Sequence, residues 1–322
     1  MSDTADPKPL TRTQSKLIDA SVVIYGDSAA KKDAAFIARQ LMQATLPHKN
    51  PGNVSTWIRK NGNLTLIMQQ GYDKEGKPYG YPYGTIPRLL LYWMTTEALR
   101  NKDSANPRRL DLGHSLKDFM ADLGLNPDNG SRGAKRSDAR RLNDQMQRFF
   151  NSFITFHGDI ERDGGQATAR LNMAVASEVV FWWSSRNPDQ TELWGSYIEL
   201  GAEFYNAITA APVPVDKRAL KALKGSALAL DLYAWLTYEA FRAHKGGKPR
   251  FETWRQMHER LGGDYKHIQH FRAAIKEALT KIQLVYPGLK LGGKQGGIEV
   301  LPESLTALQP RQTTITGRCK TL

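Results

Sequence analysis

Apolar residues recur at helical spacing in two stretches of the chain that also resemble each other in sequence. In residues 87–100 they form a single stripe, which predicts a helix with one buried side. The sequence of residues 93–100, Trp-Met-Thr-Thr-Glu-Ala-Leu-Arg, returns at 235–242 as Trp-Leu-Thr-Tyr-Glu-Ala-Phe-Arg. The chain therefore contains an internal repeat, and each copy begins with an amphipathic helix.

The segments that follow these two helices also correspond. Ser115 stands three residues before Asp118, and Thr253 three residues before Gln256, which is a pattern typical of helix N-termini. A Leu-Gly pair lies eight residues beyond each cap residue, where glycine favours a helix end. Each copy is thus predicted to contain a short second helix, at 115–123 and at 253–261.

A longer basic third helix and a β-hairpin complete each copy. The third helices are predicted at 131–153 and 264–285, where apolar residues share the spacing 4, 4 and 3: Leu142, Met146, Phe150 and Phe153, against Phe271, Ile275, Leu279 and Ile282. Alternating segments at 154–161 and 167–181 flank Asp-Gly-Gly, and residues 289–301 surround a glycine-rich turn. The predicted fold is α+β and mostly helical, with two tandem winged helix-turn-helix domains related by internal duplication.

The predicted domains are an arm at 1–55, two winged-helix domains at 56–188 and 189–305, and a flexible tail at 306–322. Most of the arm is polar and expected to be partly disordered, but residues 28–46 have the pattern of an amphipathic helix. That helix could dock on the first domain, pair with another copy of the chain, or contact DNA. Further elements are predicted as strands at 63–69, 110–112 and 193–200, the first and last being comparable, and a small helix at 216–223.

The net charge of +13 indicates a polyanionic partner. A membrane surface is disfavoured, because no apolar run approaches the roughly 18 residues of a spanning helix and neither end has a lipidation motif. Nucleic acid is therefore favoured. The polar N-terminus is unlike a signal peptide, and the single cysteine, Cys319, fits a reducing compartment, so we expect a cytoplasmic protein with no membrane partner.

The DNA-binding candidates follow from the predicted third helices, because the first turns of such a helix can enter the major groove of DNA. In the first copy they are Arg132, Lys135, Arg136, Arg140 and Arg141, and in the second Lys266, His267, Gln269, His270, Arg272 and Lys276. Lys290 and Lys294 in the second hairpin are expected to contact the DNA backbone or minor groove. The first hairpin has Asp159, Glu161 and Asp163, which would repel phosphate, so we expect fewer DNA contacts there, or protein contacts.

No catalytic, metal or cofactor site is predicted, and we expect no enzymatic activity. His267 and His270 are three residues apart, but no acidic or thiol partner lies near them in sequence. Residues 288–294 have the glycine and lysine spacing of a phosphate-binding loop, but Gln295 replaces the magnesium-binding hydroxyl residue and the segment follows a helix. The histidine triplet that a rolling-circle nickase uses is also missing from the sequence.

Several phrases of the sequence are similar to those of plasmid-encoded RepA replication initiators. They are Asn-Gly-Asn-Leu-Thr-Leu at 61–66, Pro-Tyr-Gly-Thr-Ile-Pro-Arg-Leu-Leu-Leu-Tyr-Trp at 82–93, Ser-Leu-Lys-Asp-Phe-Met at 115–120 and Ala-Pro-Val-Pro-Val-Asp at 211–216. The similarity extends over about residues 55–302. It implies a bacterial protein that binds double-stranded plasmid origin DNA at direct repeats (iterons) by paired winged-helix domains, and that recruits the host initiator and replicative helicase. It also implies a homodimer off DNA, for which residues 28–46 or the first hairpin are the candidate contacts.

Two other functions use the same features. A transcriptional repressor, including one that represses its own promoter, would bind DNA in the same way without initiating replication. An enzyme acting on DNA ends or nicks is a more distant alternative, which a nicking assay on supercoiled DNA with Mg²⁺ distinguishes.

Overall fold

Helices and antiparallel sheets alternate along the chain, so the fold is mixed α and β. The structure is a computed structural model that describes residues 11–26, 33–43, 45–127, 137–162, 165–182, 195–262 and 265–308. The expectation of a mostly helical chain therefore holds only in part. Among the described residues, no helix is long and apolar enough to cross a membrane.

The first copy of the repeat has the predicted order of elements. They are α3 (Thr85–Arg100), β4 (Arg109–Gly113), α4 (Leu116–Asp122), α5 (Asp138–Phe150), β5 (Phe153–Arg162) and β6 (Gly165–Ala174). Ser115 caps α4 as predicted, because its hydroxyl accepts the N–H of Asp118. The described part of the third helix begins at Asp138 with Ser137 as its cap, whereas residues 128–136 lie outside the described residues. Phe153 belongs to β5 and is 53% exposed, so its assignment to the apolar face of the third helix was wrong.

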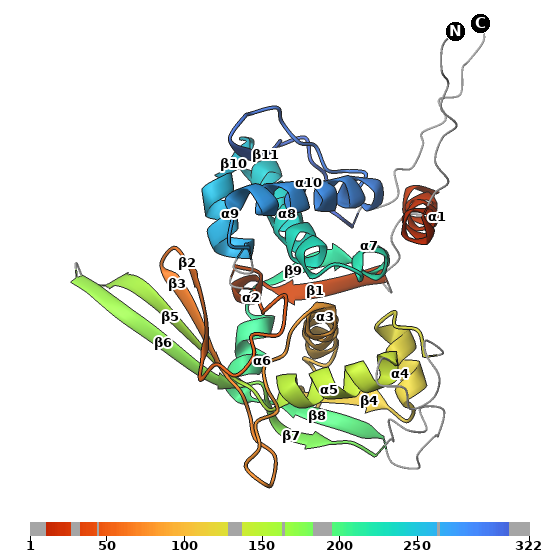
Figure 1. Cartoon of the computed structure of the whole chain (residues 1–322), viewed down its shortest axis with the longest axis vertical. Helices are drawn as coiled ribbons and strands as arrows, with labels where there is room; N and C mark the ends of the chain where they lie inside the picture. Colours follow the sequence, from red (N-terminus) through yellow and green to blue (C-terminus); the bar gives the residue numbers. More distant parts are fainter. Residues whose placement is uncertain are drawn as a thin grey trace, which may run out of the picture.

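The second copy repeats this order with shorter strands. Its elements are α8 (Ala227–Gly246), β10 (Arg250–Thr253), α9 (Trp254–Leu261), α10 (Ile268–Val285) and β11 (Gly297–Val300). Thr253 and Gln256 form the complete capping box, each side chain bonding the backbone N–H of the other residue. Figure 1 shows the two copies in separate halves of the molecule, with α3, α4 and α5 below and α8, α9 and α10 above.

Strand pairing differs between the two copies, although their helices correspond. In the second copy β10 pairs with β11, so the strand before the capped helix joins the C-terminal hairpin. In the first copy the equivalent strand β4 pairs instead with β8 (Ser196–Leu200), which also pairs with β7 (Ala176–Val180). The predicted boundary between 188 and 189 thus falls between two strands that pair with each other. A duplication of complete winged helices is therefore not established by these pairings.

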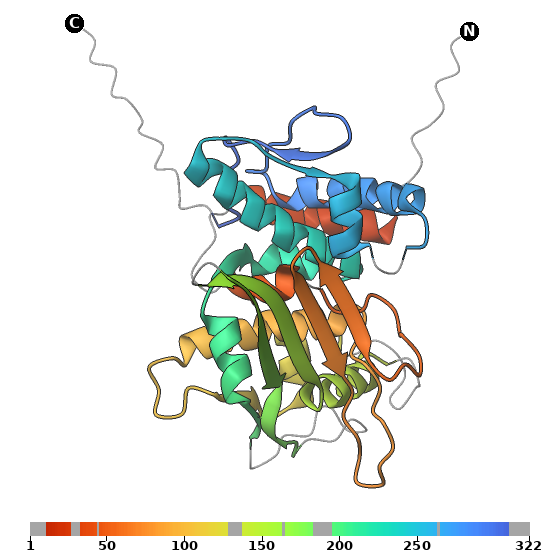
Figure 2. The same cartoon turned by 90° about the vertical axis from the view of Figure 1, so that its left-hand side faces the viewer.

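The first hairpin belongs to a larger sheet. Strands β5 and β6 continue from β3 (Leu64–Gln69) and β2 (Trp57–Asn61) in the order β2-β3-β5-β6. One face of this sheet has the buried side chains of Leu66, Met68, Ile154 and Phe156, as period-2 alternation requires. Figure 2 shows the sheet in front of α3, below the upper half of the molecule. The strands at 63–69 and 193–200, expected to be comparable, join different sheets.

The N-terminal arm forms part of the folded molecule. α1 (Arg12–Gly26) packs against α10 and α7 (Lys217–Leu223) through Leu17 and Ile24, although this segment was expected to be polar and disordered. The amphipathic helix predicted at 28–46 is also wrong. Where this segment is described it forms strand β1 (Ala34–Ala38) followed by the short helix α2 (Arg39–Gln43).

Strand β1 joins the N-terminal arm to the segment between the two copies of the repeat. It pairs with β9 (Pro212–Asp216), and the predicted small helix, α7, follows directly with Asp216 as its cap. α6 (Ala202–Thr209) precedes β9 and contacts β1 and α3. In Figure 1 the β1–β9 pair lies between the lower and upper halves, and α3 of the lower half packs on β1. The arm thus links the two copies of the repeat.

A buried ion pair joins the first helices of the two copies. Arg88 in α3 donates through Nε and Nη2 to the two carboxylate oxygens of Asp231 in α8, at 2.8 and 2.7 Å. Its remaining N–H groups reach the carbonyl oxygens of Leu46, Pro47 and Gly84, so all five guanidinium donors are used. His48 Nε2 lies 2.8 Å from Asp231 as well. This network fixes the angle between α3 and α8 through specific hydrogen bonds.

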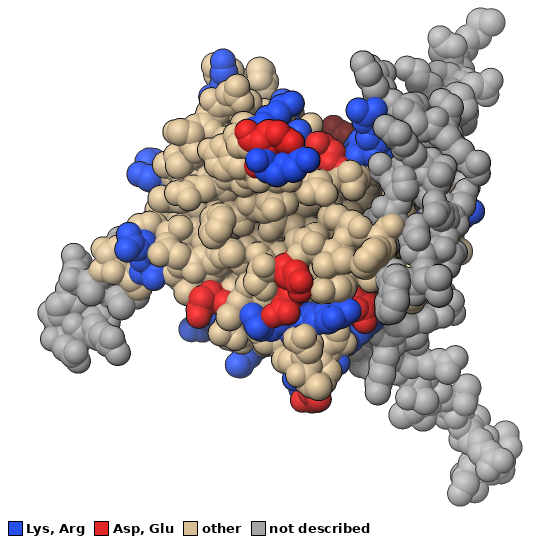
Figure 3. Space-filling model, turned by 90° about the horizontal axis from the view of Figure 1, so that it is seen from below, with Lys and Arg blue, Asp and Glu red and all other residues tan. Residues whose placement is uncertain are grey.

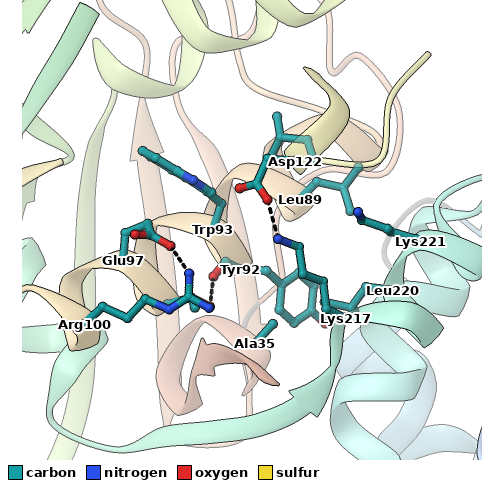
Figure 4. Close-up of a pocket in the computed structure, with 12 residues that line it drawn as sticks. Ala35, Leu89, Tyr92, Trp93, Glu97, Arg100, Asp122, Lys217, Leu220 and Lys221 are labelled. Carbon is teal, nitrogen blue, oxygen red and sulfur yellow. Dashed lines mark hydrogen bonds and ion pairs between the residues drawn. The ribbon is translucent and has the colours of Figure 1, made fainter. Parts of the chain in front are cut away.

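The junction is also packed beside α7. A cavity of about 30 Å³ is lined by Trp93 and Leu89 of α3 and by Leu220 of α7 (Figure 4). Lys217 of α7 forms an ion pair with Asp122, the last residue of α4. The cavity is small, and we interpret it as a packing gap between the two halves.

Candidate nucleic-acid interface

Helix α10 has one buried and one exposed side. Phe271, Ile275 and Ile282 are fully buried and pack toward α8 and α9, as their spacing predicts. The remaining surface of its N-terminal half points to solvent. All six candidates of the second copy are exposed there: Lys266, His267, Gln269, His270, Arg272 and Lys276.

The exposed side of α10 is positive. Residues 265–276 contain no Asp or Glu, and Lys266 and Lys276 form no ion pair with any described residue. The first acid that follows, Glu277, accepts a hydrogen bond from Lys281 at 2.6 Å. That hydrogen bond and the charge of Lys281 hold the pKa of the Glu277 carboxyl below its usual value. The cationic residues therefore face solvent, and the segment 265–276 that carries them contains no carboxylate side chain.

The start of α10 also provides backbone donors. His267 is its N-cap, and no side chain caps the first turn among the described residues. The unpaired N–H groups and the positive end of the helix dipole favour an anion such as a phosphate at this position. The rings of His267 and His270 contact each other edge to face, with centroids 5.6 Å apart. Backbone and side-chain donors thus occur together at one end of the helix.

Helix α9 holds α10 in place. Trp254, the first residue of α9, lies under the guanidinium of Arg272 at 5.4 Å from the ring centroid, which orients this arginine. At the other end of α9, His258 Nε2 bonds the carbonyl of Tyr265 at 2.9 Å. Arg260 pairs with Glu252 of β10 at 2.9 Å. Sequence reasoning missed the role of Trp254, although its place directly after the cap residue was visible.

The second hairpin presents the two predicted lysines. Its strands are joined by backbone hydrogen bonds from Gly292 to Glu299 and from Leu301 to Lys290, both 2.9 Å. Gly296 has φ +91°, and a Cβ at Gly297 would lie 2.0 Å from the carbonyl oxygen of Glu252, so both positions require glycine. Lys290 and Lys294 are exposed, and Lys294 lies over the ring of Phe251 at 4.3 Å.

Only two of the five candidates in the first copy lie within the described residues. Arg140 and Arg141 are exposed on the first turns of α5, and Arg141 pairs with Asp138 at 3.0 Å. Arg132, Lys135 and Arg136 precede the described helix and lie outside the described residues. The side chains of Asp159, Glu161 and Asp163 in the first hairpin do so too. The described residues therefore support a DNA-binding surface on the second copy more fully than on the first.

Positive charge elsewhere on the molecule is often matched by acids. Figure 3, the view from below, shows Lys and Arg next to Asp and Glu, with a broad surface of other residues between them. On the β4–β8 sheet, Arg108 pairs with Glu199 at 2.7 Å, and Arg109 lies near Asp111 and over the ring of Tyr197. The opposite charges of such a pair largely cancel each other's field at the distance of a bound phosphate backbone. This makes the α10 surface a better anion site than the sheet β4–β8–β7.

A family model and a solved structure are similar to the chain. The family model, described as plasmid encoded RepA protein, matches residues 81–256, more than half of the sequence. No match is found among curated protein sequences. The solved structure, described as "Crystal structure of SeMet derivatives of domain2 and domain 3 of RctB", has a TM-score of 0.48 at 10% identity, over 87% of this chain and 97% of that chain.

Proposed function

Because the chain belongs to the family of plasmid-encoded RepA proteins, we propose that it is a non-catalytic replication initiator that binds double-stranded origin DNA sequence-specifically. The observation that carries this proposal is the exposed side of α10, where cationic and amide side chains surround a helix start that has no side-chain cap among the described residues. Arg272 can bond guanine with two parallel donors, and Gln269 can do the same with adenine. Lys290 and Lys294 suit contacts with phosphates.

Both copies of the repeat take part in this proposal, as tandem winged-helix units that arose by duplication. The recurring order of helix, strand, capped helix, long helix and hairpin supports it, and the different pairing of β4 marks divergence of the first copy. Two linked units bind direct repeats far more tightly than one, since the second contact is intramolecular. In this proposal the bound initiator recruits the host initiator and helicase.

A footprint and titration on the origin of the parent plasmid test DNA binding. Arg272→Ala combined with Lys276→Ala should weaken specific binding by about 2–5 kcal/mol, because both a base contact and a charge are lost. Lys74→Ala combined with Lys77→Ala is the matched control, since both lysines are exposed in the loop after β3 and their loss also removes two positive charges. Normal binding by the α10 variant would exclude this helix as the recognition element.

The first copy is tested separately. Arg136→Ala combined with Arg140→Ala should shorten the footprint and weaken binding, whereas unchanged binding, or a wild-type footprint of one groove turn, would exclude paired binding. A plasmid with only the repeats and this gene then distinguishes initiator from repressor. Replication of that plasmid is expected, and its failure, with binding intact, would favour the repressor.

A further inference from the structure

A second surface of the molecule combines an apolar hollow with basic residues. The hollow has a volume of about 690 Å³ and lies between α8, β9 and the start of α2. Its apolar part includes Pro212, Val213 and Pro214 of β9 and the ring of Phe241, which is 48% exposed. This volume is within the range of small-ligand and peptide-anchor pockets. None of its lining residues belongs to α5, α10 or the hairpin 289–301.

Four cations surround the hollow, and none of its lining residues is acidic: they are Arg39, Arg242, Lys245 and Arg250. Behind them lies one buried carboxylate, Glu239, whose side chain is 6% exposed. It pairs with Arg242 at 3.0 Å and with Arg250 at 3.1 Å. Four positive charges against one negative charge leave the rim positive. An occupant must therefore bring both an apolar group and negative charge.

The aromatic rings of this groove are partly covered by its cations. The guanidinium of Arg242 lies over the ring of Tyr238 at 5.5 Å, and the ammonium of Lys245 lies over the ring of Phe241 at 6.0 Å. Each ring thus has a cation on one face, which leaves at most one face of each ring for a base to stack on. These contacts also hold the two cations at the rim, where they can meet carboxylates.

Strand addition to β9 is blocked as well. The N–H of Phe36 in β1 points away from β9, because it donates to Thr96 Oγ1 at 2.9 Å. Phe36 and Pro214 are therefore a non-hydrogen-bonded pair, and the N–H that Pro214 lacks would lie on the outer edge of β9. Pro212, two residues earlier, lacks the same donor. The edge cannot pair with another strand, and an occupant must bind through its side chains.

We propose that this groove binds an acidic amphipathic helix of another protein. Its apolar side chains occupy the hollow beside Phe241, and its carboxylates meet Lys245 and the arginines of the rim. A helix satisfies its own backbone groups, which suits a groove that offers no strand edge. A second copy of this chain is the less favourable occupant, since both copies have a net charge of +13 and repel each other. The proposal does not rest on DNA binding.

The test is fluorescence polarisation with a labelled synthetic peptide of about 14 residues, or four helical turns. The peptide has two leucines four residues apart and glutamates around them. Saturable binding to the full-length protein is expected, and Phe241→Ser and Lys245→Glu should each weaken it at least about tenfold. Lys74→Glu, the same charge change outside the groove, should leave it unchanged. Peptides with Leu→Ser or Glu→Gln should also bind more weakly.

Other outcomes overturn the proposal. Absence of saturable binding excludes the groove as a site for such helices. If Lys245→Glu and Lys74→Glu weaken peptide binding equally, that binding is unspecific charge attraction. Displacement of the peptide by oligothymidylate, with Phe241→Ser weakening both ligands alike, makes nucleic acid the occupant. Self-association that Lys245→Glu removes makes a second copy the occupant. Thermal melts of each variant test whether the fold is retained, and these surface changes are expected to preserve it.

Discussion

The carboxylate of Asp231 illustrates how a single buried charge supports the junction between the repeats. Burial opposes its ionisation, but the charge of Arg88 and the hydrogen bonds from Arg88 and His48 outweigh this, so the pKa of Asp231 lies below its usual value. The side chains of Asp231 and Arg88 are only 7% and 2% exposed. Because both side chains are almost fully buried, water cannot take the place of either one if it is removed. Each charge therefore depends on the other for its stabilisation.

Asp231→Asn should lower the free energy of unfolding by about 3–5 kcal/mol, because Arg88 would be left buried without its counter-charge. Urea denaturation measures this. Asp111→Asn is the control, since Asp111 is 79% exposed beside Arg109, and its loss should cost less than about 1 kcal/mol. Similar losses for both variants would mean that the buried pair contributes no more than a surface pair.

The same carboxyl predicts an acid dependence. Its pKa is lower in the folded than in the unfolded chain, so the ionised form stabilises the fold at neutral pH. This stabilisation begins to be lost as the pH falls below about 4 and is gone below the folded-state pKa. The difference in urea stability between wild type and Asp231→Asn should therefore shrink below about pH 4. A constant difference from pH 7 to pH 3 would contradict it.

The sequence contains a signal for the Arg88–Asp231 pair, which lies just outside the two repeated phrases. Arg88 interrupts an apolar run five residues before Trp93, and Asp231 interrupts another four residues before Trp235. Opposite charges at neighbouring positions of two repeated apolar helices favour a buried contact between those helices. By contrast, the exposure of Gln269, Arg272 and Lys276 followed from helical periodicity alone.

At the scale of elements, local sequence signals predicted the helices of both copies. The elements that these signals did not predict depend on pairing with strands far away in the sequence. Caps and glycine stops lie within a few residues of the elements they end, as Thr253 and Ser115 show. The segment 34–38 has alternating burial at Ala35 and Ile37 because β9 pairs with it, although β9 is far away in sequence. Local propensity could not supply that partner.

The capping box of α9 gives a prediction at this scale. Thr253→Ala should lower the free energy of unfolding by about 1 kcal/mol, because the N–H of Gln256 would lose its acceptor. Thr253→Ser keeps the hydroxyl and should cost less. Chemical denaturation compares the two, and equal stability of the Ala and Ser variants would show that the cap contributes little.

For the whole molecule, the copies of the repeat cannot be separated where the sequence suggested. A fragment of residues 56–188 lacks β8 and leaves β4 and β7 without their common partner. We expect it to aggregate or unfold without cooperativity, whereas a fragment of residues 56–210, which includes β8, should unfold more cooperatively. Circular dichroism during heating and sedimentation compare the two. A soluble, cooperative 56–188 fragment would restore the boundary that the repeat predicted.

The pairing of β1 with β9 has a consequence for synthesis. The N-terminal strand leaves the ribosome early, but its partner strand is made only after most of the first copy, and α10, on which α1 packs, comes later still. Contacts so distant in sequence close slowly, and the first copy can collapse before them. Strand β1 and helix α1 therefore join the fold only after the first copy, and chaperones would meet β1 as an exposed apolar strand.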